Sequence, residues 1–127
     1  EKLKPGGAFQ VAVALDVHSE WHIYANPASR PEYVATTLQV TSELPLEALK
    51  IQYPESRAFP AEGVSEPVAV YSGKSSIVVS ARLGARAVPG ESELKLALRY
   101  QACNNQQCLA PKTVQIIVPV VVARDGD

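Results

Sequence analysis

Hydrophobic and polar residues alternate with a period of two along most of the chain. The clearest example is the segment 8–17, in which every second residue is large and apolar. This alternation is typical of a β-strand with one buried face. On that face we expect Phe9, Val11, Val13, Leu15 and Val17. The same pattern predicts further strands at 36–40, 49–53, 75–83, 93–100 and 113–122.

Residues that favour turns separate the predicted strands. Proline, glycine and serine cluster in the segments 27–32, 53–63 and 87–92. The segment 42–50 predicts at most one helical turn. About seven short strands at this spacing predict an all-β fold, an antiparallel β-sandwich of immunoglobulin-like architecture. Pro119 lies inside the last predicted strand, and since proline cannot donate a ladder hydrogen bond, we expect an edge or a bulge there.

Length and charge narrow the class of protein. The chain of 127 residues fits a single domain, 1–127, that can bury a core without disulfides. Its net charge of -1 gives no indication of nucleic-acid binding. No apolar run approaches the length of a membrane span, so a soluble domain is expected, with flexible ends at 1–7 and 124–127. Because methionine is absent, we expect a processed or excised part of a longer, exported protein.

The two cysteines offer the clearest candidate chemistry. Cys103 and Cys108 are separated by four polar residues in YQACNNQQCLAPKT. As a structural staple, a disulfide closing so short a loop adds only roughly 2 kcal/mol, against about 4.7 kcal/mol for a loop of 100 residues. As a redox pair, the thiols have no acidic neighbours between them, and Arg99 and Lys112 add positive charge on either side, which favours the thiolate. Both interpretations stay open at this point.

A zinc site is the third interpretation, with His18 and His22 joining the cysteines. If residues 18–22 are extended, the histidines lie about 13 Å apart, which is too far for one ion with bonds of about 2 Å. We therefore expect no metal and no other cofactor, and His18 is expected to be a solvated residue at a strand end. Nucleophile-elbow and metalloprotease motifs are absent, so hydrolase chemistry is not indicated.

Three stretches resemble the family of N-terminal periplasmic domains of the thiol:disulfide interchange protein DsbD. They are YQACNNQQCLAPKT, VYSGKSSI and WHIYANP. The resemblance implies an immunoglobulin-like fold and thiol–disulfide exchange through a mixed disulfide, with Cys108 attacking and Cys103 resolving. It implies a periplasmic location within an inner-membrane protein. The electron donor would be a membrane-embedded redox domain, expected in the same polypeptide, and the clients thioredoxin-fold oxidoreductases such as a disulfide isomerase and a cytochrome c maturation thioredoxin.

The resemblance also implies which residues surround the disulfide. Neighbours of the sulfurs would be His22, Tyr24, Gln101 and Pro111. A movable cap controlling access would consist of Val68, Ala69, Val70, Tyr71, Ser72 and Gly73. This cap carries small aliphatic residues where the best-known members have acidic residues and a phenylalanine, and the intercysteine loop has four residues where theirs has five.

Two alternatives remain beside the resemblance. Residues 68–73 can instead form an ordinary strand followed by a turn, with Tyr71 in the core. The whole domain can instead be a non-catalytic binding or assembly module whose hairpin disulfide is structural.

Parity predicts the register of the hairpin that carries the cysteines. If the even-numbered leucines before it and the even-numbered aliphatic residues after it face one core, paired positions sum to an even number. These residues are Leu96, Leu98, Val114 and Ile116. The positions of Cys103 and Cys108 sum to an odd number. One extra residue must therefore be absorbed between the cysteines and the regular ladder, most simply as a bulge near Ala110 and Pro111.

Overall fold

The computed structural model describes residues 2–59, 67–104 and 106–124, and these residues form strands, turns and loops without a helix. The strands are β1 (Lys2–Leu3), β2 (Ala8–Val17), β3 (His22–Tyr24), β4 (Thr37–Ser42), β5 (Leu46–Gln52), β6 (Arg57–Phe59), β7 (Val68–Tyr71), β8 (Gly73–Leu83), β9 (Gly90–Tyr100), β10 (Ala102–Cys103) and β11 (Lys112–Val122). The all-β fold class is confirmed. Within the described ranges there is no helix long and apolar enough to cross a membrane.

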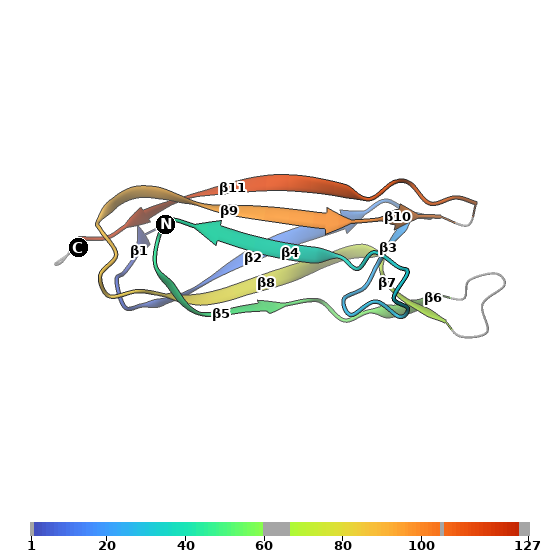
Figure 1. Ribbon diagram of the computed structural model, residues 1–127, viewed down its shortest axis with the longest axis horizontal. Helices are drawn as coiled ribbons and strands as arrows, with labels where there is room; N and C mark the ends of the chain where they lie inside the picture. Colours follow the sequence, from blue (N-terminus) through green and yellow to red (C-terminus); the bar gives the residue numbers. More distant parts are fainter. Residues whose placement is uncertain (1, 60–66, 105, 125–127) are drawn as a thin grey trace.

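The strands form three sheets, with the orders β1-β11-β9-β4, β2-β8-β5 and β10-β3-β7-β6. Figure 1 shows the first two sheets lying against each other, with their strands running along the long axis of the molecule. The third sheet lies at one end, and β1 and the end of β11 lie toward the other end. This is the immunoglobulin-like β-sandwich predicted from the sequence, with a small additional sheet at the end that carries the cysteines.

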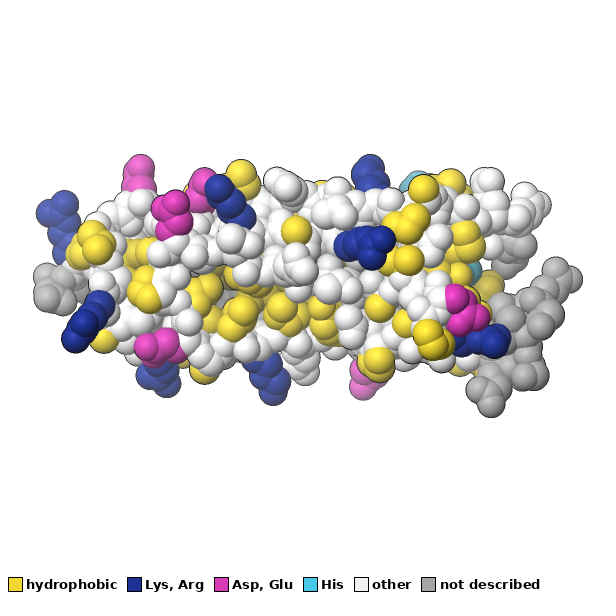
Figure 2. All heavy atoms as spheres, in the orientation of Figure 1, with side chains coloured by type: hydrophobic (Ala, Val, Ile, Leu, Met, Phe, Trp, Pro, Cys, Tyr) yellow, Lys and Arg dark blue, Asp and Glu magenta, His cyan; other side chains and the backbone are white. Residues whose placement is uncertain are grey.

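Two apolar clusters fill the space between the sheets. The larger one takes side chains from β2, β4, β8 and β9 and continues into β3 and β7. The smaller one surrounds β1 and the adjoining ends of β8, β9 and β11. Figure 2 shows hydrophobic side chains in a band between β4 and β5, where the sandwich is open to view. The period-two prediction is confirmed on β2, whose odd-numbered residues are buried or half-buried while its even-numbered residues are exposed.

The N-terminal segment and the segment 42–50 differ from the predictions. Residues 2–7 are not a loose end, because β1 pairs in parallel with β11 and the Ala123 backbone N–H donates to the Leu3 carbonyl at 2.7 Å. Residues 1 and 125–127 lie outside the described residues. The predicted helical turn is wrong, since β5 pairs with β8 there, with a register shift between Glu47 and Lys50. Hydrogen-bonding groups along β8 override a weak local preference for helix.

The register predicted for the long hairpin is confirmed. Leu98 pairs with Val114, so paired positions of β9 and β11 sum to an even number. Pro119 pairs with Glu93 of β9, whereas β1 pairs with β11 only beyond it, at the last two residues of the strand. Among the described residues, β11 is therefore an edge at Pro119, as the missing N–H of proline requires.

Candidate functional site

The cysteines lie where the chain leaves one sheet and joins another. β9 ends at Tyr100, and after Gln101 the chain forms β10, which belongs to the third sheet. There Cys103 pairs with His22 of β3 in antiparallel fashion. This crossing brings the first cysteine against a strand that lies some eighty positions earlier in the sequence, which local patterns do not reveal.

The hairpin absorbs one extra residue between the cysteines and the regular ladder. The ladder ends at the pair Tyr100 and Lys112, and the next pair is the isolated bridge between Cys103 and Cys108. Two residues separate these pairs on the first arm and three on the second, Leu109–Pro111. The predicted irregularity near Ala110 and Pro111 is confirmed, and Pro111 itself lies exposed on this arm.

Hydrogen bonds hold the two arms together across this irregular stretch. The Leu109 backbone N–H donates to the Ala102 carbonyl at 2.9 Å. Gln101 Nε2 donates to the Leu109 carbonyl at 3.1 Å. Gln101 therefore supports the backbone next to Cys108.

Asn104 organises the loop between the cysteines. Its Oδ1 accepts hydrogen bonds from the backbone N–H groups of Gln106 and Gln107, each at 2.8 Å. Its own N–H donates to the Gln107 carbonyl at 2.8 Å. Asparagine is favoured in tight turns because its side chain can bond to the backbone a few residues on. The sequence analysis missed this role, although an asparagine directly after a strand end is a recognisable turn signal.

Cys103 and Cys108 form a disulfide between two residues that differ in exposure. Cys103 is only 2 % exposed and lies within the third sheet, whereas Cys108 is exposed on the outer arm. Thiol–disulfide exchange needs an incoming thiolate to reach one of the sulfurs. Cys108 is therefore the more accessible residue of the pair.

The Tyr24 hydroxyl lies beside both sulfurs, at 3.5 Å from Cys103 Sγ and 3.8 Å from Cys108 Sγ. Because disulfide sulfurs carry no hydrogen, the hydroxyl is the donor. Burial raises the pKa of Tyr24, and the neighbouring Tyr33 raises this pKa further, so the hydroxyl stays protonated at neutral pH. It is a hydrogen-bond donor placed where negative charge develops when the disulfide opens.

Tyr33 fixes the ring of Tyr24. The two rings are stacked, with centroids 4.5 Å apart and planes at 4°. The loop that carries Tyr33 returns to β3 through Thr36, whose Oγ1 donates to the Tyr24 carbonyl at 2.7 Å. The sequence analysis missed Tyr33, because only the folded loop brings it back onto β3.

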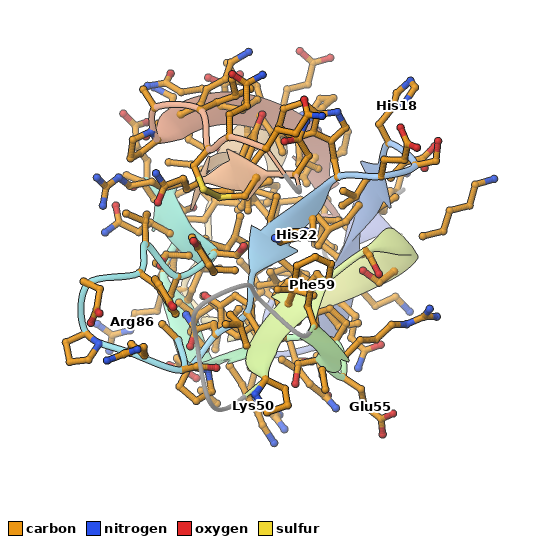
Figure 3. All side chains as sticks on the ribbon, turned by 90° about the vertical axis from the view of Figure 1, so that its right-hand side faces the viewer. His18, His22, Lys50, Glu55, Phe59 and Arg86 are labelled. Carbon is orange, nitrogen blue, oxygen red and sulfur yellow. A yellow bond between two sulfur atoms is a disulfide. The ribbon has the colours of Figure 1, made fainter. Side chains whose placement is uncertain are left out.

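His22 pairs with Cys103 across β3 and β10, and its side chain is buried against Phe59. The ring centroids are 4.2 Å apart, and the two side chains meet near the centre of Figure 3. Burial lowers the pKa of His22, which favours the neutral imidazole. Its neighbourhood to the disulfide comes from backbone pairing with Cys103.

His18 lies apart from His22, at the periphery of Figure 3, and is exposed just after β2 as predicted. The assumption that residues 18–22 are extended is wrong, because the Trp21 N–H donates to the His18 carbonyl at 3.0 Å and closes a turn. Within the described ranges, no three His, Cys, Asp or Glu side chains form a group that could hold a metal ion.

Residues 68–73 include strand β7, which lies between β3 and β6. Tyr71 is 2 % exposed and belongs to the larger core cluster. Its hydroxyl accepts from the Asn26 N–H at 3.0 Å and donates to the Asn26 carbonyl at 3.3 Å. Only Ser72 separates β7 from β8, which begins at Gly73, whose φ of 66° suits glycine. The segment therefore matches the alternative interpretation in having a strand with Tyr71 in the core, although a second strand and not a turn follows it. Control of access by this segment stays a prediction.

The fold and the site together define an immunoglobulin-like β-sandwich domain with an asymmetrically exposed hairpin disulfide at one end. Residues 2–119 match the family described as "Thiol:disulfide interchange protein DsbD, N-terminal". The chain belongs to this family, as the resemblance of its cysteine hairpin indicated.

A solved structure supports the same fold. The crystal structure of the N-terminal periplasmic domain of ScsB from Proteus mirabilis superimposes with a TM-score of 0.65 at 14% sequence identity. The match covers 91% of this chain and 42% of that chain, so the present chain spans less than half of that structure. No curated protein sequence matches the chain.

Proposed function

We propose that this protein is a periplasmic thiol–disulfide exchange domain that relays electrons through Cys103 and Cys108. The donor would be a membrane-embedded reductase domain, and the clients would be periplasmic thioredoxin-fold oxidoreductases, including a disulfide isomerase and a cytochrome c maturation thioredoxin. Membership of the DsbD N-terminal family supports the exchange chemistry. The observation that carries the proposal is the exposed Cys108 bonded to a buried Cys103.

Electrons enter by attack on the exposed sulfur. A donor thiolate attacks Cys108 Sγ and forms a mixed disulfide, the Cys103–Cys108 bond breaks, and its electron pair leaves on Cys103 as a thiolate. The second donor thiolate then attacks the donor sulfur of the mixed disulfide and releases Cys108. The donor is thereby oxidised to a disulfide, and the domain becomes a dithiol after its thiolates take up protons.

Electrons leave by the same route in reverse. The Cys108 thiolate attacks the client disulfide, and one client sulfur departs as a thiolate. Cys103 is paired with Cys108 by an isolated antiparallel β-bridge. Its thiolate then attacks Cys108 Sγ and releases the second client sulfur. The client is reduced to a dithiol and the domain returns to its disulfide.

Tyr24 assists the step in which Cys103 becomes a thiolate. Its hydroxyl already lies 3.5 Å from Cys103 Sγ, so it can donate to that sulfur without moving far. A hydrogen bond to a charged group is stronger than one to a neutral sulfur, so the donor favours the opened state. Because Cys103 is shielded from water, this donor replaces solvation that the buried thiolate lacks.

The reduction potential of the pair tests the proposal against the structural alternative. A relay dithiol is expected to have a potential between about -270 and -120 mV, the range of known exchange proteins. A potential well below about -300 mV is typical of a structural bond and would support a binding or assembly module instead.

Trapping experiments test the roles of the two cysteines. The Cys103→Ser variant keeps the exposed thiol and should accumulate a mixed disulfide with an oxidised periplasmic disulfide isomerase. The matched Cys108→Ser variant keeps only the buried thiol and should accumulate little. Equal trapping by both variants would contradict the assigned roles.

A further inference from the structure

An apolar groove of about 550 Å³ opens beside the disulfide hairpin. It lies where β2 and β11 form neighbouring edges of the two sandwich sheets. Its lining includes the aromatic and aliphatic residues Trp21, Tyr100, Ala102, Leu109, Val114 and Ile116. Its charged or titratable lining residues are Asp16 and His18 near the end of β2, and Tyr100 at the end of β9.

The groove extends to Leu109, the residue next to Cys108. Leu109 directly follows Cys108 and is 49% exposed although it is a large aliphatic residue. Its backbone is bonded on both sides, to the Ala102 carbonyl and to Gln101 Nε2. Leu109 therefore presents an apolar side chain at a fixed place between Cys108 and the rest of the groove.

We propose that this groove receives an apolar side chain next to the reacting cysteine of the partner protein, which makes it a specificity site for the exchange reaction. The proposal rests on the proposed function, because a mixed disulfide brings the partner's sulfur within one bond of Cys108. The residues flanking the partner's cysteine must then lie over the neighbours of Cys108, and Leu109 is the first of these.

The chemistry of the lining sets the kind of partner. Burying an apolar side chain against Leu109, Val114 and Ile116 removes apolar surface of both proteins from water, which favours the complex. A charged or strongly polar flank would lose its hydration without gaining a partner in most of the groove. The preferred partner is therefore an oxidoreductase whose exposed cysteine is flanked by aliphatic or aromatic residues.

Two synthetic peptides test the proposal on the intact, oxidised protein. One is a blocked pentapeptide with leucine on both sides of its cysteine, and the other has serine at these places. We expect the leucine peptide to open the disulfide about fivefold faster than the serine peptide, as partial burial of one leucine side chain would give. The ratio of these rates is the readout, since it cancels any change in the intrinsic reactivity of the disulfide.

The variants Leu109→Ser and Ile117→Ser test whether the preference for the leucine peptide arises in the groove. Ile117 is 56% exposed and is not among the groove residues, so its replacement removes a similar side chain elsewhere on the surface. The rate ratio should fall to about one in Leu109→Ser and stay about fivefold in Ile117→Ser. Equal rates for both peptides on the native protein, or a ratio unchanged in Leu109→Ser, would overturn the proposal. Failure of dithiothreitol to reduce the native disulfide would overturn the proposed function as well.

Discussion

The Tyr24 hydroxyl lies 3.5 Å from Cys103 Sγ, the buried sulfur of the disulfide, and this contact joins β3 to β10 at the end of the sandwich. Cys103 is the sulfur that would carry negative charge when a thiolate attacks Cys108. A protonated phenol at this distance can stabilise that charge in surroundings with little water. Loss of this donor should therefore change the rate of disulfide exchange more than the stability of the fold.

Replacing Tyr24 by phenylalanine should slow reduction of the disulfide by dithiothreitol by roughly fivefold, corresponding to about 1 kcal/mol of lost hydrogen bonding to the leaving thiolate. In the reduced protein the pKa of the Cys103 thiol should rise, because the thiolate loses a donor. Stopped-flow reduction and thiol titration measure both effects. An unchanged rate and thiol pKa would show that the hydroxyl has no part in exchange.

Tyr33 should act through Tyr24. The Tyr33→Ser variant removes the stacked ring, whose contribution is about 0.5–1.5 kcal/mol, and should slow reduction in the same direction as Tyr24→Phe. The Tyr33→Phe variant keeps the stack and should react like the native protein. In a double variant of Tyr24→Phe and Tyr33→Ser, the second change should have little further effect on the rate. Additive effects would indicate that Tyr33 acts independently.

Replacing Val70 and Tyr71 together by glycine should unfold the domain. Each truncation of a large core side chain costs about 2–5 kcal/mol, and small domains have only about 5–15 kcal/mol of stability in total. Circular dichroism should show loss of the fold, and the milder Tyr71→Phe variant should lower the free energy of unfolding by about 1–2 kcal/mol. A double variant that stays folded while its disulfide is reduced faster would instead support a movable cap at residues 68–73.

His22 should make the domain less stable as the pH falls. Burial lowers its pKa in the folded state below the ordinary value of 6.5, so the unfolded chain binds the proton more readily. The stability contributed by neutral His22 is complete above about pH 6.5 and decreases as the pH falls toward the folded-state pKa. Urea unfolding between about pH 7.5 and pH 5 should show a smaller slope in His22→Phe than in the native protein. His18 is exposed, so His18→Gln should keep the native slope.

Removal of metal ions should leave the protein unchanged. A structural zinc site would contribute part of the folding free energy, so a chelator would lower the melting temperature of a zinc-dependent domain. We expect EDTA to leave the melting temperature and the circular dichroism spectrum as they were. A decrease of several degrees, restored by added zinc, would reopen the interpretation with two cysteines and two histidines.

Much of the sandwich could be predicted from local patterns. On β2 the alternation identified the buried face, because a strand turns successive side chains to opposite sides. The parity of Leu98 and Val114 predicted the register of β9 and β11, and the odd sum of the cysteine positions predicted the extra residue between them. The segment 42–50 was predicted wrongly, since its strand exists through pairing with β8 and not through its own preference.

In the candidate site, too, some features could be predicted from the sequence and others could not. The sequence by itself determined which residues can exchange electrons, since only two thiols are present, and it placed them on a hairpin with a short polar loop. Only the tertiary structure decided that Cys103 is buried against β3 while Cys108 is exposed, and that Tyr24 and Tyr33 meet beside them. Alternation and turn signals act over a few residues, whereas the contacts of Tyr24 with Cys103 and Cys108 join positions 79 and 84 residues apart. The stack of Tyr24 on Tyr33 is closer in sequence, but it depends on how the loop between them folds. Such contacts form only when the sheets close, so the arrangement of the site belongs to the folded chain.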